Sequence, residues 1–213
     1  MIDLHLHSTF SDGELIPSEV VSRALFAGYT HLAITDHVDP SNLENVVDRM
    51  VHVCSELRGK VRAQVYPGVE ITHVPPRLIA PLAALARERG AKVILVHGET
   101  IVEPVPKGTN FAAIRANVDI LAHPGLITEE EARLARKQGV LLEITSRRGH
   151  SLTNGHVARI AAKTGARLVY NTDSHSPGDF TPWEEALQII RGAGLTEKDA
   201  ARMQANAREL VER

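Results

Sequence analysis

The sequence has little cysteine, few aromatic residues and no excess of one charge. Cys54 is the only cysteine in 213 residues, so no intramolecular disulfide can form, and we expect a reducing, cytoplasmic setting. Aromatic residues make up only 4% of the chain, which leaves few side chains for stacking on nucleic-acid bases. Because 24 lysines and arginines oppose 26 aspartates and glutamates, the formal net charge is -2, and no broad basic field is available for a polyphosphate strand.

No segment has the pattern of an export signal or of a membrane span. Polar Asp3, His5 and His7 interrupt the start of the chain, where a signal peptide needs an apolar stretch of about 7 to 15 residues. The apolar run from Leu78 to Ala86 contains Pro81 and falls short of the roughly 20 residues that a spanning helix requires. Since 43% of the residues are hydrophobic and 23% are charged, we expect a compact, water-soluble protein with no membrane partner.

Apolar, β-branched runs alternate with helix-like segments along the whole chain, which is typical of parallel α/β folds. Seven runs are predicted to be strands: residues 2–7, 31–36, 61–71, 92–97, 119–123, 140–145 and 167–172. Eight segments are predicted to be helices: residues 17–28, 42–58, 75–89, 111–117, 128–138, 153–164, 181–192 and 197–212. Strands such as residues 93–96 are almost entirely apolar, which indicates a sheet covered on both faces.

The order of these elements favours one closed architecture. No Gly-rich phosphate loop follows the first strand, so a barrel of about seven strands is favoured over an open doubly wound sheet. No shift in composition marks a linker, and we therefore expect a single domain over residues 1–213.

Ligand-type side chains stand at the carboxyl ends of the predicted strands, which share one face of a parallel barrel. His5 and His7 are two residues apart on a strand and therefore point to the same side, as do Asp173 and His175 if the last strand continues through them. So many imidazoles and carboxylates would repel each other unless a cation neutralised them, and the sequence therefore predicts a divalent metal site. The strand-end residues are His5, His7, Asp36, His37, Glu70, His97, His123, Asp173 and His175.

Six short motifs follow one another along nearly the whole chain: Asp3-Leu4-His5-Leu6-His7-Ser8-Thr9-Phe10-Ser11-Asp12-Gly13, Ile34-Thr35-Asp36-His37, Pro67-Gly68-Val69-Glu70, Val96-His97-Gly98, Ala122-His123-Pro124-Gly125 and Thr172-Asp173-Ser174-His175. In this order they resemble the motifs of the PHP (polymerase and histidinol phosphatase) superfamily. The resemblance implies a distorted (β/α)7 barrel of TIM type and a trinuclear metal centre.

The resemblance also implies a set of nine ligands for three divalent ions. One ion would be held by His5, His7, Glu70 and Asp173, a second by Glu70, His97 and His123, and a third by Asp12, His37 and His175. Some family members have histidine where this chain has Asp12, and both residue types are adequate ligands. Imidazole-rich ligation suits Zn²⁺, Mn²⁺ or Fe²⁺.

Charge counting indicates an anionic substrate. Three divalent ions and three carboxylates leave about +3 on the site, which a phosphate ester and a metal-activated hydroxide would balance. We therefore predict hydrolysis of a phosphate ester, with the nine ligands acting through that hydroxide. The stretch from His97 to Asn110 resembles histidinol-phosphatase-like members of the superfamily, which implies a phosphomonoesterase for a small phosphorylated metabolite.

Cations in two loops on the same face are candidate phosphate contacts. Lys107 follows the fourth predicted strand, and Arg147 and Arg148 follow the sixth. Arginine suits a bidentate contact with phosphate, and lysine suits a point-charge contact. His150 and His156 are weaker candidates, because nothing in the sequence fixes the direction of their side chains.

Three other functions are compatible with parts of this pattern. A PHP-type exonuclease or oligonucleotide phosphodiesterase would use the same metals, but it would also need aromatic platforms and a basic groove. A metal-binding accessory module without turnover resembles polymerase-associated PHP domains, but those domains typically lack ligands. An amidohydrolase needs a bridging lysine at the end of the fourth strand, where this chain has His97.

Several conspicuous residues receive a structural interpretation. His31 opens a strand at the stability face of the barrel, and His52 lies within a helix. His73 lies beyond the end of its strand, and Cys54 on a helix is expected to be a small core residue. Two carboxylates remain to be placed: we expect Asp36 to orient a ligand histidine, and Glu143 faces inward or outward depending on the strand register.

Overall fold

The computed structural model describes every residue from Met1 to Arg213, and its strands and helices alternate as predicted. The strands are β1 (Ile2–Leu6), β2 (His31–Ile34), β3 (His37–Val38), β4 (Gln64–Ile71), β5 (Val93–His97), β6 (Ile120–Ala122), β7 (Leu141–Thr145) and β8 (Leu168–Asn171). The helices are α1 (Pro17–Phe26), α2 (Leu43–Leu57), α3 (Pro76–Glu88), α4 (Thr109–Arg115), α5 (Glu129–Gln138), the short 3₁₀ helix η1 (His150–Thr153), α6 (Asn154–Thr164), α7 (Trp183–Gly192) and α8 (Glu197–Glu212).

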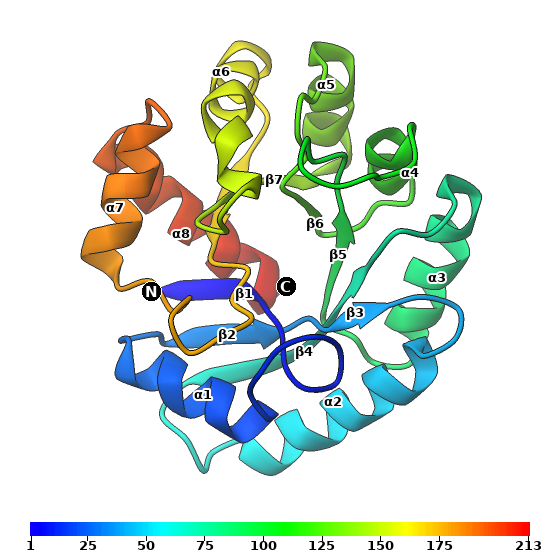
Figure 1. Cartoon of the computed structure of the whole chain (residues 1–213), viewed down its shortest axis with the longest axis vertical. Helices are drawn as coiled ribbons and strands as arrows, with labels where there is room; N and C mark the ends of the chain where they lie inside the picture. Colours follow the sequence, from blue (N-terminus) through cyan, green and yellow to red (C-terminus); the bar gives the residue numbers. More distant parts are fainter.

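The strands form a nearly closed parallel barrel in the order β1-β2-β4-β5-β6-β7-β8, with helices α1 to α7 around it (Figure 1). Between β8 and β1 the barrel is joined by a single parallel bridge, Leu6 to Ser174, next to which the His7 backbone N–H donates to the Ser174 carbonyl over 2.9 Å. Because β1 and β8 are joined only by this bridge, the barrel is not fully closed and is distorted at this point. The predicted distorted (β/α)7 barrel is confirmed.

The second predicted strand, residues 31–36, is broken in two. Its first part is β2, whereas β3 begins at His37 and pairs with Glu70 and Ile71 of β4. Thr35 lies in the break, and its methyl group would be 2.6 Å from a Cβ atom at position 68. Gly68 is therefore required for this close approach, and the register along β4 is the same on both sides of the break, because Ile34 pairs with Pro67 and His37 with Glu70.

Two layers of apolar side chains hold the barrel. Inside it, residues from β1, β2, β5, β6, β7 and β8 pack together, and Ala207, Leu210 and Val211 of α8 join this inner cluster. Outside it, 34 buried residues pack the strands against α2 to α8. Gln204 of α8 accepts from the Ile2 backbone N–H over 2.7 Å, which places α8 across the amino-terminal end of the barrel. The opposite, carboxyl-terminal end remains open for polar residues.

No helix of the structure combines the length and the apolar character that crossing a membrane requires.

Candidate metal centre

The carboxyl ends of the strands surround a polar cavity of about 220 Å³ with no hydrophobic residue in its lining. Three further residues, His5, His7 and Glu70, lie buried close to the lining carboxylates and imidazoles. The nine predicted ligands are thus brought together, although they come from segments up to 170 positions apart (from His5 to His175). The lining residues are Asp12, His37, Thr72, His73, His97, Glu103, His123, Arg147, His150, Asp173 and His175.

Asp173 and His175 lie beyond the last strand, so the condition under which their side chains would point to the same side of a strand is not met. Strand β8 ends at Asn171, and Asp173 has a left-handed backbone with φ of 55°. His123, just after β6, also has positive φ, at 26°. A non-glycine residue in such a conformation costs about 1 to 3 kcal/mol, so the surroundings must hold it there. The His123 backbone N–H donates to Glu143 over 3.0 Å, and this hydrogen bond helps to stabilise the conformation of His123.

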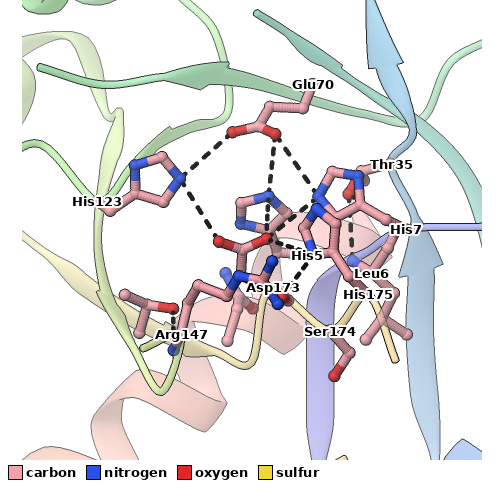
Figure 2. A network of polar contacts seen from close by, with 12 residues as sticks. His5, Leu6, His7, Thr35, Glu70, His123, Arg147, Asp173, Ser174 and His175 are labelled. Atoms are coloured by element: carbon pink, nitrogen blue, oxygen red, sulfur yellow. Dashed lines mark hydrogen bonds and ion pairs between the residues drawn. The ribbon is translucent and has the colours of Figure 1, made fainter. Parts of the chain in front are cut away.

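The buried floor of the cavity consists of His5, His7, Glu70, His123 and Asp173. At its centre, the Glu70 and Asp173 carboxylates face the same imidazoles (Figure 2). Glu70 Oε2 lies 3.3 Å from His5 Nε2 and 3.6 Å from His7 Nε2, while its Oε1 lies 3.5 Å from His123 Nε2. Asp173 lies 3.3 Å from His7 Nε2, 3.6 Å from His5 Nε2 and 3.7 Å from His123 Nε2. Two carboxylates therefore share three histidines.

Several of these buried atoms have no hydrogen-bond partner. They are His5 Nε2, both ring nitrogens of His7, both carboxylate oxygens of Glu70 and His123 Nδ1. A buried polar group without a partner costs about 1 to 3 kcal/mol, and native proteins rarely leave six such atoms in one place. Cations between the nitrogens and the oxygens would satisfy most of them, so the donor set fits divalent metals.

Oxygen acceptors on the far side of the rings turn three of the histidines toward the cavity. His5 Nδ1 donates to Glu143 over 2.8 Å. His37 differs, because its Nδ1 lies 2.7 Å from the hydroxyl of the cavity residue Thr72 and 2.8 Å from Glu70 Oε2. His97 Nδ1 and His175 Nδ1 donate to the backbone carbonyls of Gly98 and Asp173, over 3.2 and 3.0 Å. A proton on Nδ1 leaves the Nε2 lone pair of a neutral imidazole free, as in metal-binding histidines whose other nitrogen is fixed by an oxygen.

Glu143, whose direction the sequence left open, therefore faces inward. It is fully buried and accepts from three donors: His5 Nδ1, the His123 backbone N–H and Asn171 Nδ2, the last over 2.7 Å. It thus orients two of the predicted ligands at once.

The pKa shifts of the floor residues, and of His37 beside them, favour positive charge in the cavity. Burial lowers the pKa of His37, but the Glu70 and Asp12 carboxylates outweigh it and raise the pKa to about 10. Burial likewise raises the pKa of Glu70, but His5 and His37 hold that pKa well below its usual range. Burial lowers the pKa of His7 to about 3, with the neighbouring His37 adding to the effect. Without metal, protons on some imidazoles therefore balance the carboxylates.

A third group of donors lies beside the floor. Asp12 Oδ1 lies 3.4 Å from His37 Nε2 and 3.3 Å from His175 Nε2, and one ligand atom from each of these residues and from His7 falls within 4.8 Å of the others. Asp36 supports this group, although not by orienting a histidine as the sequence suggested. Its carboxylate accepts from Ser8 N and Ser8 Oγ, both over 2.7 Å, and so fixes the loop that carries Asp12.

Glu103 is a cavity residue that the sequence analysis missed. Its Oε2 lies 3.0 Å from His97 Nε2 and 3.2 Å from His73 Nε2, and its Oε1 lies 3.4 Å from His150 Nε2. A hydrogen bond from His97 lowers the pKa of Glu103 to about 2 despite partial burial. Glu103 is in the loop between β5 and α4 rather than at a strand end, so the strand-end pattern carried no signal for it.

His150, a weaker candidate from sequence, also lines the cavity, with its ring stacked on that of His123 at a centroid distance of 4.0 Å. The other weak candidate, His156, lies on α6, where its Nε2 contacts the Ile127 carbonyl over 2.8 Å.

Only one of the three candidate phosphate contacts lines the cavity. Arg147 does so, and its Nη1 donates to Asp179 over 3.2 Å. Lys107 is exposed and outside the lining, and Arg148 borders a separate hollow with Asp179 and Glu185.

The residues given a structural interpretation lie away from the cavity, with the exception of His73. His31 stacks on Tyr66 at a centroid distance of 6.3 Å, and His52 is exposed on α2. Cys54 is buried in the cluster that packs β1 and β2 against α1 and α2.

One family model matches most of the chain: the model of the PHP domain covers residues 3–167. An uncharacterized protein of Methanocaldococcus jannaschii is 46% identical over 199 residues, which cover 92% of this chain and 91% of that protein. The DNA polymerase/3'-5' exonuclease PolX of Bacillus subtilis is 27% identical over 82% of this chain, which spans 34% of that protein. A probable histidinol-phosphatase of Thermotoga maritima is 47% identical over 49 residues, 22% of this chain and 21% of that protein.

Solved structures share the fold at low sequence identity. A chain in the cryo-EM structure of archaeal ribonuclease P with mature tRNA has a TM-score of 0.73 and 19% identity, covering 100% of this chain and 90% of that one. Histidinol phosphate phosphatase from Lactococcus lactis, complexed with zinc, L-histidinol and phosphate, has a TM-score of 0.62 and 17% identity, covering 91% of this chain and 94% of that one.

Proposed function

Since this chain belongs to the PHP domain family and is a metal-dependent phosphoesterase, we propose that its substrate is a small phosphate monoester. The observation that carries the proposal is the cavity itself. Its lining combines metal-type donors with one arginine, and its volume of about 220 Å³ suits a phosphate with a small leaving group. No Phe, Tyr or Trp lines it, so it offers no platform on which the bases of a strand would stack.

We propose that the nine residues predicted from sequence hold three divalent ions, of zinc, manganese or iron. The unpartnered floor atoms and the orientation of the Nε2 atoms support this assignment. The proposed ligands are His5, His7, Asp12, His37, Glu70, His97, His123, Asp173 and His175. All nine belong to one barrel, which we propose forms a single domain over residues 1–213.

When bound, divalent ions in such a site lower the pKa of water and neutralise the charge that develops on the phosphoryl group. The chain's own groups bind and orient the substrate. Arg147 is the guanidinium of the lining, and Asp179 holds it in place, so that it can pair with phosphate oxygens. Glu103 is ionised at neutral pH because of the hydrogen bond from His97, so it is not the acid that protonates the leaving group.

The names of relatives support a phosphatase and also leave a second candidate. The probable histidinol-phosphatase of Thermotoga maritima resembles a short part of this chain and favours a phosphorylated metabolite. The PolX exonuclease of Bacillus subtilis resembles more of the chain, and it favours an oligonucleotide phosphodiesterase as the second candidate. A non-catalytic accessory module would have no use for the complete donor set.

One assay distinguishes these functions. Metal-loaded protein is given p-nitrophenyl phosphate, histidinol phosphate, a nucleoside 3',5'-bisphosphate or a short oligonucleotide, and released phosphate or nucleotide is measured. We expect turnover of small monoesters, loss of turnover in His123→Ala, and unchanged turnover in His52→Ala, whose exposed side chain lies on α2. Turnover of the oligonucleotide alone would establish the second candidate, and no turnover of any substrate would favour the accessory module.

A further inference from the structure

Three histidines around Glu103 are arranged like those around Glu70. Glu103 Oε2 faces His97 Nε2 and His73 Nε2 at 3.0 and 3.2 Å, and its Oε1 faces His150 Nε2 at 3.4 Å. These histidines follow different strands: His97 ends β5, His73 follows β4 and His150 begins η1 after β7. Neither Glu103, His73 nor His150 belongs to the set of nine predicted ligands.

The hydrogen bond on the far side of His97 shows what its Nε2 presents to Glu103. His97 Nδ1 lies 3.2 Å from the Gly98 carbonyl, which only accepts, so Nδ1 carries the proton. Nε2 then either carries a second ring proton, as in the hydrogen bond to Glu103 described above, or presents a lone pair to the carboxylate oxygen 3.0 Å away. A lone pair and a carboxylate oxygen in that position repel each other unless a metal ion lies between them, so a cation can take the place of the proton.

The distances fit a metal ion. Two donors that each lie about 2.1 Å from one zinc ion are themselves about 3.0 to 3.4 Å apart in octahedral or tetrahedral geometry. The distances from Glu103 to His97 Nε2 and His150 Nε2, 3.0 and 3.4 Å, fall in this range. Ligand atoms of His97, His123 and His150 lie within 4.8 Å of one another, and so do those of His73, His97 and Glu103, so His97 belongs to both groups.

We propose that Glu103 is a metal ligand of this chain, donating a carboxylate oxygen to the cation held by His97 and His123, with His150 as a further donor. This inference rests on the proposed metal centre but not on the identity of the substrate. Glu103 adds a fourth carboxylate to the site and lowers its net charge from about +3 to about +2. His73 contacts the same carboxylate oxygen as His97 and holds it toward the cation.

Metal binding tests this proposal without any substrate. Metal-free protein is titrated with Co²⁺, and bound ions are counted by elemental analysis while the visible d–d spectrum reports their coordination. In Glu103→Gln we expect one of the ions to bind about 100-fold more weakly, with a changed spectrum, and the others to bind as before. The matched control is Glu130→Gln, on the exposed side of α5, for which we expect the titration of the unchanged protein.

A second variant separates a shared ion from an independent one. His123→Ala removes a predicted ligand of the same cation, so adding Glu103→Gln to it should cause no further loss of Co²⁺. If the double variant lost a second Co²⁺ ion, Glu103 and His123 would not share one ion. If Glu103→Gln alone bound Co²⁺ like the unchanged protein, Glu103 would not be a ligand and would be only an ion-pair partner of the histidines. Because turnover is not measured, either failure leaves the proposed phosphoesterase standing, and a failed substrate assay leaves this result standing.

Discussion

The floor and the rim of the cavity use the same chemistry under different solvation. On the floor, the Glu70 carboxylate is fully buried and faces His5, His7 and His123. The rim is the more exposed part of the lining, formed by Glu103, Arg147 and the histidines around Glu103. There the Glu103 side chain is 38% exposed and faces His73, His97 and His150. Water can solvate the rim carboxylate, whereas neither oxygen of the floor carboxylate has a hydrogen-bond partner, and its Oε2 faces His37 Nδ1 at 2.8 Å. Burial, rather than the residue types, therefore makes the floor dependent on a cation.

The two regions are also supported differently. Glu70 is on β4, paired on one side with β3 and on the other with β5, so its backbone is fixed by the sheet. Glu103 is in a loop whose far end is held by the Glu99 carboxylate, which accepts from Gly108 N and Asn110 N, both over 3.0 Å. We therefore expect changes on the floor to affect the whole site and changes on the rim to affect one ion.

The largest effect is expected from Glu70→Gln, which removes the floor charge and keeps the side-chain shape. We expect this variant to lose at least two of the three ions and to lower kcat/KM by about 1000-fold or more, because the carboxylate is central to the buried donors. Elemental analysis and the monoester assay measure both effects, and circular dichroism checks the fold. If Glu70→Gln kept all its metal while Glu103→Gln lost one ion, the ranking of floor over rim would be wrong.

The second-largest effect is expected in the dependence of metal affinity on pH. His37 has its pKa raised to about 10, so in metal-free protein at neutral pH its ring is protonated and must lose that proton before it binds metal. The pKa values of His5 and His123 are also raised, because the nearby carboxylates outweigh burial. Metal affinity should therefore increase as pH rises toward 10, by about tenfold per pH unit for each proton released.

The metal-free protein should show the opposite trend in stability. The folded-state pKa of His37 is above its ordinary value of 6.5, so its charge stabilises the fold fully below pH 6.5, and this contribution is lost as pH rises through about 10. Calorimetry of metal binding in buffers of different ionisation enthalpy counts the protons, and urea unfolding of chelator-treated protein measures the stability. Binding without proton release at pH 7 would contradict this account of the floor.

A smaller effect is expected from Glu143→Gln, which tests the support behind the floor. Glu143 accepts from three donors, and a glutamine amide would place its own N–H groups against at least one of them. We expect metal affinity to fall by about 10- to 100-fold, because His5 and the His123 backbone lose their alignment. The Co²⁺ titration of metal-free protein measures this affinity. An affinity equal to that of the unchanged protein would show that the strand ends alone align the floor.

Much of the floor could be predicted from the sequence, because strand ends are fixed by the fold. Once seven apolar runs indicate a parallel barrel, the residues that follow each run must meet at one face, and His97 and His123 do so. Asp173 meets them too, but by a left-handed turn, which local sequence patterns do not specify for an aspartate. Register decides whether Glu143 faces inward, and a pattern of apolar residues that is buried on both faces does not reveal register.

The rim could not be predicted in the same way. Glu103 lies five residues beyond Gly98 in a loop, and its position depends on contacts with His73, His97 and His150 that come from three other elements. Exposed glutamates in loops are common and usually solvated, so the residue type alone carries no signal. The three loop cations looked equivalent in the sequence for the same reason, although only Arg147 lines the cavity.

The smallest effect is expected from these loop cations, and it compares two neighbouring arginines, of which only Arg147 lines the cavity. Arg147→Ala removes the only guanidinium of the lining, and we expect KM for a phosphate monoester to rise by about tenfold with metal content unchanged. Arg148→Ala alters a side chain that borders a different hollow, and we expect KM to change by less than about twofold. Steady-state kinetics on the two variants measure the contrast. If Arg148→Ala raised KM as much as Arg147→Ala, the loop after β7 would have to turn when substrate binds, and the rim would differ from the floor in motion as well as in solvation.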